Sequence, residues 1–108
     1  NLAGYWADVA DDVAAASAAG RDFDGGSFEW CALGALRLHY TAFTGDVISK
    51  TGAGRYGLDV APAEFHDVLR LAIEGRPSGW AHAIDGRAMT AAASLIEWVC
   101  ADVARADR

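Results

Sequence analysis

The sequence predicts a single compact all-α domain of about four main helices, which pack around one of their number, a buried central helix. Hydrophobic residues make up 53% of the chain, and many of them are alanines, which enter helices more readily than any other residue. Several stretches repeat their apolar residues at steps of three and four, which is the spacing of one helix face. A length of 108 residues is typical of one domain, so we expect residues 1–108 to share one core.

The first expected helix runs from Leu2 to Ala19 and is amphipathic. Its apolar stripe is formed by Leu2, Trp6, Val9, Val13 and Ala16, and its other side carries Asp8, Asp11 and Asp12. Gly20 should end this helix in the left-handed conformation, because glycine adopts that conformation without steric cost.

The second expected helix, Ser27–Phe43, is the central one because apolar residues cover nearly its whole circumference. Ser27 is its expected N-cap, since a serine hydroxyl accepts a hydrogen bond from a backbone N–H in the first turn. Gly34 costs about 1 kcal/mol in helix propensity. We expect another helix to cross close against Gly34 in compensation, so that a leucine there is badly tolerated.

The segment Gly45–Leu58 contains four glycines and is predicted to be an exposed loop. Loops of this length are often functional. A third helix should begin at Pro62 and end at the turn formed by residues 75–79, and Asp85 should cap or bend the chain before the last helix, Arg87–Ala106.

The net charge of −6 is concentrated near the start of the chain, where residues 1–31 hold six acids and one base. Free nucleic acid is therefore an unexpected ligand, because phosphate binding depends on clustered lysines and arginines. No apolar run is long enough to span a membrane, and the start lacks the order of a signal peptide. These features predict a cytoplasmic protein with no membrane partner.

Cys31 is the one reactive residue type whose local setting in the sequence suggests chemistry. It lies near the start of the central helix, where the helix dipole favours a thiolate, and a catalytic role would need a histidine base from His39, His66 or His82. Its apolar neighbours favour a packing role instead. Because Cys31, Cys100 and the histidines show no paired spacing, we expect reduced thiols, no metal site and no cofactor.

Four residues are expected to contact a protein partner, namely Lys50, Arg55, Tyr56 and Trp80. Arginine, tyrosine and tryptophan are enriched at binding hot spots. The glycine-rich segment that contains the first three lacks the spacing of a nucleotide-binding phosphate loop, so a nucleoside triphosphate is not the predicted ligand.

Residues 30–36 read Trp-Cys-Ala-Leu-Gly-Ala-Leu. This motif resembles the Trp-Cys-x-x-Gly-Ala-Leu core of a small uncharacterised domain found in actinobacterial and phage-encoded proteins, and the resemblance covers about the first 40 residues. That family has no known activity, so the resemblance implies no catalytic residue. It implies an accessory or phage-related role.

The sequence favours a small acidic intracellular protein-interaction module that binds a protein partner or a second copy of itself as a homodimer. A cysteine-dependent enzyme that uses Cys31 with a histidine base is the alternative. A mimic of nucleic-acid charge is the third interpretation, because the chain has fifteen acids among 108 residues.

Overall fold

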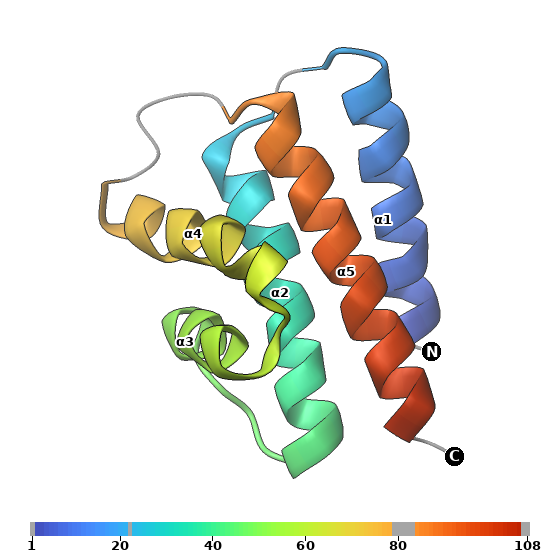
Figure 1. Ribbon diagram of the computed structural model, residues 1–108, viewed down its shortest axis with the longest axis vertical. Coiled ribbons are helices and arrows are strands. Elements are labelled where there is room, and N and C mark those ends of the chain that lie inside the picture. Colours follow the sequence, from blue (N-terminus) through green and yellow to red (C-terminus); the bar gives the residue numbers. More distant parts are fainter. Residues whose placement is uncertain (1, 22, 79–83, 107–108) are drawn as a thin grey trace.

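The computed structural model describes residues 2–21, 23–78 and 84–106, and it confirms the all-α prediction (Figure 1). Within these ranges the chain forms α1 (Leu2–Ala18), α2 (Gly25–Thr44), α3 (Lys50–Val60), α4 (His66–Ser78) and α5 (Gly86–Ala106), with a single 3-10 turn at Ala63–Phe65. The described part of the chain contains no strand, only an isolated backbone bridge between Phe23 and Ile84.

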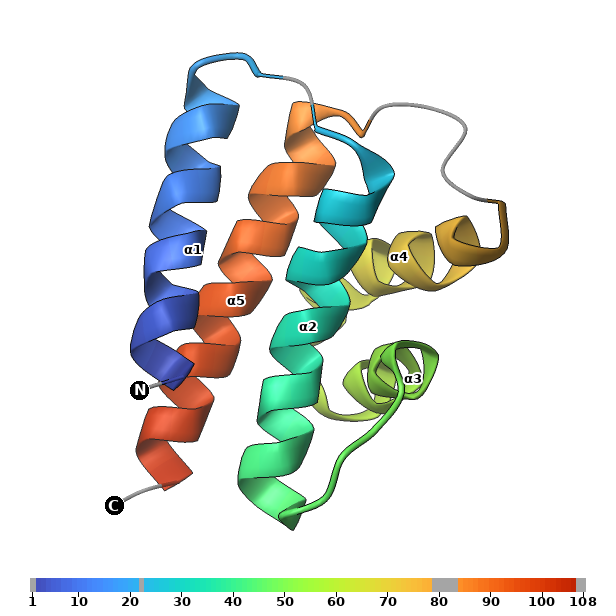
Figure 2. The ribbon, with the colours of Figure 1, turned by 180° about the vertical axis from the view of Figure 1, so that it is seen from behind.

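Two helices form the centre of the molecule. α5 packs against both α1 and α2, and α2 also packs against α3 and α4 (Figures 1 and 2). α3 and α4 therefore lie on the other side of α2 from α1. Apolar side chains from α2 and α5 form most of the core. The largest fully buried side chains are Leu69 of α4 and seven from α2 and α5, namely Phe28, Leu33, Leu36, Met89, Leu95, Ile96 and Val99. The predicted central position of the second helix is confirmed, and α5 shares that position.

The ends of α2 are set by local hydrogen bonds. Its N-cap is Asp24, whose carboxylate accepts from the backbone N–H of Ser27 at 2.7 Å, so the prediction that Ser27 caps the helix was wrong. An aspartate caps as well as a serine does, and here it lies three residues earlier. Gly45 ends α2 with a φ of 77°, and Gly20 follows α1 with a φ of 75°, which confirms the predicted left-handed glycine after the first helix.

The predicted loop at Gly45–Leu58 was also wrong, because most of it belongs to α3. Ser49 caps this helix by accepting from the N–H of Gly52 at 3.0 Å. Its glycines serve close packing: a Cβ built on Gly54 would lie 2.6 Å from Ile73, and one built on Gly57 would lie 3.0 Å from Leu36. Contact with α2 and α4 therefore offsets the low helix propensity of these residues.

The last two helices differ from the prediction at their boundaries. The 3-10 turn follows Pro62 and precedes α4, which continues to Ser78 instead of ending near residue 75. Asp85 caps α5 as expected, since its carboxylate accepts from the N–H of Ala88 at 2.9 Å. Among the described helices, none combines the length and the apolar character needed to cross a membrane.

Candidate functional site

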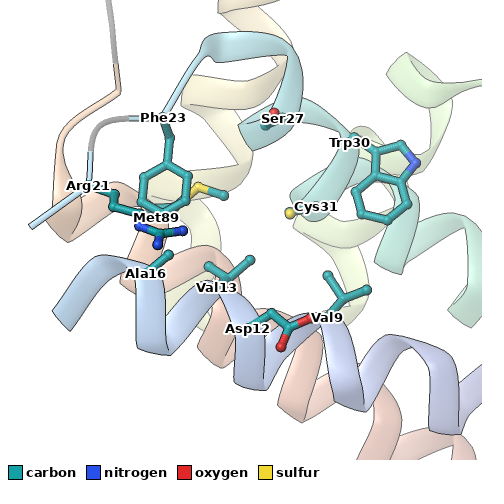
Figure 3. Close-up of a pocket in the computed structure, with 10 residues that line it drawn as sticks. All are labelled: Val9, Asp12, Val13, Ala16, Arg21, Phe23, Ser27, Trp30, Cys31 and Met89. Atoms are coloured by element: carbon teal, nitrogen blue, oxygen red, sulfur yellow. The ribbon is translucent and has the colours of Figure 1, made fainter. Parts of the chain in front are cut away.

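A groove of about 360 Å³ lies between α1 and α2 (Figure 3). We call it the α1–α2 groove, and its lining consists of Val9, Asp12, Val13, Ala16, Arg21, Phe23, Ser27, Trp30, Cys31 and Met89. Most of these side chains are apolar. The four from α1 are spaced three and four residues apart, so they share one face of that helix, and Met89 adds a side chain from α5.

Trp30 lines one end of the α1–α2 groove and belongs to a cluster of three aromatic rings. The rings of Trp6 and Trp30 lie 4.7 Å apart, and Tyr5 meets both of them edge-on. Trp6 is buried, whereas Tyr5 is 53% exposed and Trp30 is 39% exposed. Exposed aromatic side chains beside an apolar groove are typical of a binding surface.

Trp6 also explains the glycine in the middle of α2. A Cβ built on Gly34 would lie 2.7 Å from the indole ring of Trp6, which is closer than real Cβ atoms come. The expected close neighbour of Gly34 is therefore confirmed, although the approach is made by a side chain of α1. The absence of a side chain at Gly34 lets the Trp6 ring approach α2 closely and contact Trp30, which lines the groove.

One acid of α1, Asp12, lines the groove, although the sequence pattern placed it on the opposite side of α1 from Val9 and Val13. Asp8, Asp11 and Asp12 are exposed, and none of them pairs with a base in the part of the chain that the structure describes. Asp12 and Arg21 line the α1–α2 groove and also border a second, adjoining hollow whose other walls are alanines of α1. These charges are available to a binding partner because no internal ion pair neutralises them.

The Cys31 thiol faces this groove but is unsuited to nucleophilic attack. The residue is 3% exposed, and burial raises the pKa of its thiol to about 11. Because α2 begins at Gly25, Cys31 lies in the second turn, beyond the strongest effect of the helix dipole. Both cysteines are free thiols, as predicted, and Cys31 forms no hydrogen bond with a histidine of the described ranges.

His39 instead joins three helices through a buried hydrogen-bond network. Its Nε2 lies 2.7 Å from Oδ2 of Asp102 on α5, and its Nδ1 lies 2.6 Å from the hydroxyl of Tyr56 on α3. The imidazole is buried and stacks between the rings of Phe43 and Trp98. Nε2 donates to the carboxylate, because an ionised carboxylate can only accept, and in the neutral imidazole Nδ1 accepts from the tyrosine.

The pKa values in this network favour a structural role. The hydrogen bonds from His39 and Arg105 hold the pKa of Asp102 below its usual value, so the carboxylate stays ionised. Burial, with Asp102 and Tyr40 nearby, raises the pKa of the Tyr56 phenol. The phenol therefore keeps its proton and donates a hydrogen bond to Nδ1 of His39, which fastens α3 to α2 and α5.

The other candidate residues are scattered over the structure. Lys50 begins α3 and is half-buried, Arg55 is exposed on the same helix, and both lie across α2 from the groove. His66 donates from Nε2 to the carbonyl of Ala61 at 3.1 Å near the start of α4. Trp80 and His82 lie outside the described residues. No cluster of metal-ligating side chains was found within the described ranges.

Sequence reasoning missed the α1–α2 groove and the contribution of Asp102. Asp102 lies 63 residues from His39, and no spacing in the sequence connects them. Tyr56 was predicted to contact a partner, whereas its hydroxyl is occupied by His39. The sequence predicted the apolar stripe of α1 that includes Val9 and Val13. It did not predict that this stripe lines an open groove against α2.

Comparisons with known proteins supply no relative from which a function can be transferred. No family model matches the chain, and neither the curated proteins nor the solved structures include a significant match. The resemblance of residues 30–36 to an actinobacterial and phage domain stays a prediction. In the structure, Trp30 and Cys31 of this segment line the groove, whereas Leu33 and Leu36 are fully buried in the core.

Proposed function

We propose that this chain is a protein-interaction module whose α1–α2 groove receives an apolar segment of a cationic protein partner. The observation that carries the proposal is an apolar groove lined by the exposed Trp30, whose ring contacts the exposed Tyr5. Burial of apolar surface drives most protein association, and aromatic residues are enriched at its centres. Ligand pockets have volumes of roughly 300–1,000 Å³. The groove, at about 360 Å³, is near the lower end of this range and has room for a few side chains of a partner.

The charge of the partner follows from the charge of the groove's surroundings. Residues 1–31 hold six acids and one base, and the three carboxylates of α1 lack an internal partner among the described residues. Complementary charge accelerates association and excludes partners of the same sign. A partner segment that carries a base opposite Asp12 is favoured for this reason. A second copy of this chain would bring an equally acidic surface to the same place, so a homodimer through the groove is disfavoured.

A selection from a peptide library tests the proposal directly. The full chain is immobilised and used to enrich displayed peptides, and the affinity of an enriched peptide is measured by fluorescence anisotropy. We expect enriched peptides to combine apolar residues with lysine or arginine. Val9→Lys places a charge in the half-buried lining of the groove and should weaken binding about tenfold or more, because the bound peptide would bury that charge.

Val47→Lys is the matched control, because it makes the same substitution at a site remote from the groove. Val47 is 85% exposed in the segment between α2 and α3. This variant should bind within about twofold of the wild type, since exposed charges away from an interface contribute little. Circular dichroism of both variants should show the helical signal of the wild type. Equal affinity of Val9→Lys and Val47→Lys would refute the proposal, and so would a wild-type dimer that Val9→Lys dissociates.

A further inference from the structure

Two opposite charges line the α1–α2 groove without neutralising each other. Asp12 and Arg21 both contribute to its walls, and no ion pair joins them or links either of them to another described residue. Opposite charges held apart in one site set the order of charges that a ligand must present. The positions of Asp12 and Arg21 therefore define the charges of a ligand more closely than the net acidity of α1 does.

The two charges occupy different parts of the groove. Asp12 lies on α1 between Val9 and Ala16, whereas Arg21 comes from the connection after α1 and lies beside Phe23, at the end away from Trp30 (Figure 3). Val9 to Ala16 covers about two helical turns, roughly 10 Å. The lining thus runs from aromatic rings, past a carboxylate on the α1 wall, to a guanidinium at the connection.

The shape of the groove favours a helical occupant. It lies between α1 and α2, which both pack on α5, and Trp6 of α1 reaches Trp30 and Gly34 of α2. A helix laid over such a groove presents residues three or four apart on one face, about 5–6 Å between Cβ atoms. The apolar lining residues Val9 and Val13 have the same four-residue spacing along α1.

We infer that the α1–α2 groove selects an amphipathic helix with two apolar side chains about one turn apart, a base facing Asp12 and an acid facing Arg21. This inference rests on the proposed function and adds the order of charges that the partner must carry. The bound apolar side chains shield the two pairs from water, which strengthens their attraction. The charges then discriminate among partners more than they add affinity.

Three short synthetic helical peptides test this order. All have blocked ends and the same two leucines one turn apart, and their flanking positions carry lysine and glutamate, two lysines, or two glutamates. Fluorescence anisotropy at low salt should rank the lysine–glutamate peptide first on the wild-type chain. Arg21→Glu should make the two-lysine peptide the best ligand, and Asp12→Lys should favour the two-glutamate peptide, with each preference changing by about tenfold.

Matched controls separate local pairing from the effect of net charge. Arg55→Glu and Asp67→Lys make the same charge changes at exposed sites on α3 and α4. These variants should keep the wild-type ranking of the three peptides. The preferences created by Arg21→Glu and Asp12→Lys should also weaken as salt is added, because partly exposed pairs are screened.

The outcomes distinguish the inference from the proposed function. In one outcome, Val9→Lys lowers the affinity of all three peptides, and Arg21→Glu binds them in the same order of affinity as Arg55→Glu does. The groove then binds a helix, but the inferred order of charges is overturned. If Val9→Lys has no effect on peptides that bind, the groove itself is not the site and both proposals are overturned. Failure of all three peptides to bind the wild-type chain also overturns the inferred ligand.

Discussion

Removal of the Asp102 carboxylate should destabilise the fold through the buried histidine that it holds. Asp102→Ala deletes the acceptor for Nε2 of His39, and His39 is only 3% exposed. A buried donor left without a partner costs roughly 1–3 kcal/mol. The Asp102 side chain is itself 27% exposed, so water reaches the truncated site, and we expect a loss of about 1–2 kcal/mol. The melting temperature should fall by roughly 4–12 °C.

Urea unfolding followed by circular dichroism at neutral pH measures this loss. Asp102→Asn keeps an acceptor oxygen for His39 and should cost less than Asp102→Ala, because it removes only the charge. Glu97→Ala is the control: Glu97 is exposed on the same helix, so its removal should change the free energy of unfolding by about 0.5 kcal/mol or less. Equal stabilities of Asp102→Ala and Glu97→Ala would refute a structural role for the network.

The same carboxylate adds a pH dependence with a defined sign. Hydrogen bonds from His39 and Arg105 lower the pKa of Asp102 in the folded state below the ordinary value of 3.8. A depressed pKa stabilises the fold above the unfolded-state pKa, and this stabilisation disappears as the pH falls through the folded-state pKa. The stability difference between the wild type and Asp102→Asn should therefore shrink below about pH 4. A difference that stays constant to about pH 3 would contradict this assignment.

Two further predictions concern α2 and the thiols. Gly34→Leu should lower the melting temperature by more than about 10 °C, because its side chain must displace the ring of Trp6, whereas Ala42→Leu at an exposed position of the same helix should leave it nearly unchanged. An unchanged melting temperature for Gly34→Leu would show that Trp6 moves at little cost. In the folded protein, iodoacetamide should modify the half-buried Cys100 before the buried Cys31, and mass spectrometry that finds equal rates would contradict the burial of Cys31.

Local signals predicted the helical fold well where packing and propensity agree. The spacing of Trp6, Val9 and Val13 predicted α1, and Gly20 predicted its end, because both depend on neighbours within one or two turns. The apolar circumference of the second helix predicted its central position. The burial of Cys31 was also favoured by its apolar neighbours.

α3 was missed because its signal is not local. Gly54 and Gly57 lower helix propensity, and a glycine-rich segment read by itself is typical of a loop. In the structure these glycines let α3 approach Leu36 and Ile73 closely, and that packing holds the helix. Propensity is a weak preference that tertiary contacts override.

Local sequence patterns were enough to place every main helix except α3, to identify most of the apolar helix faces, and to show where the negative charge gathers. These properties depend on residues within a few positions of one another. Only the tertiary structure decided which side chains meet: the carboxylate of Asp102 with His39, and Val9 of α1 with Trp30 of α2 in one groove. These contacts depend on how the other helices pack against α5, and no local sequence pattern encodes that packing. The α1–α2 groove is a product of this packing.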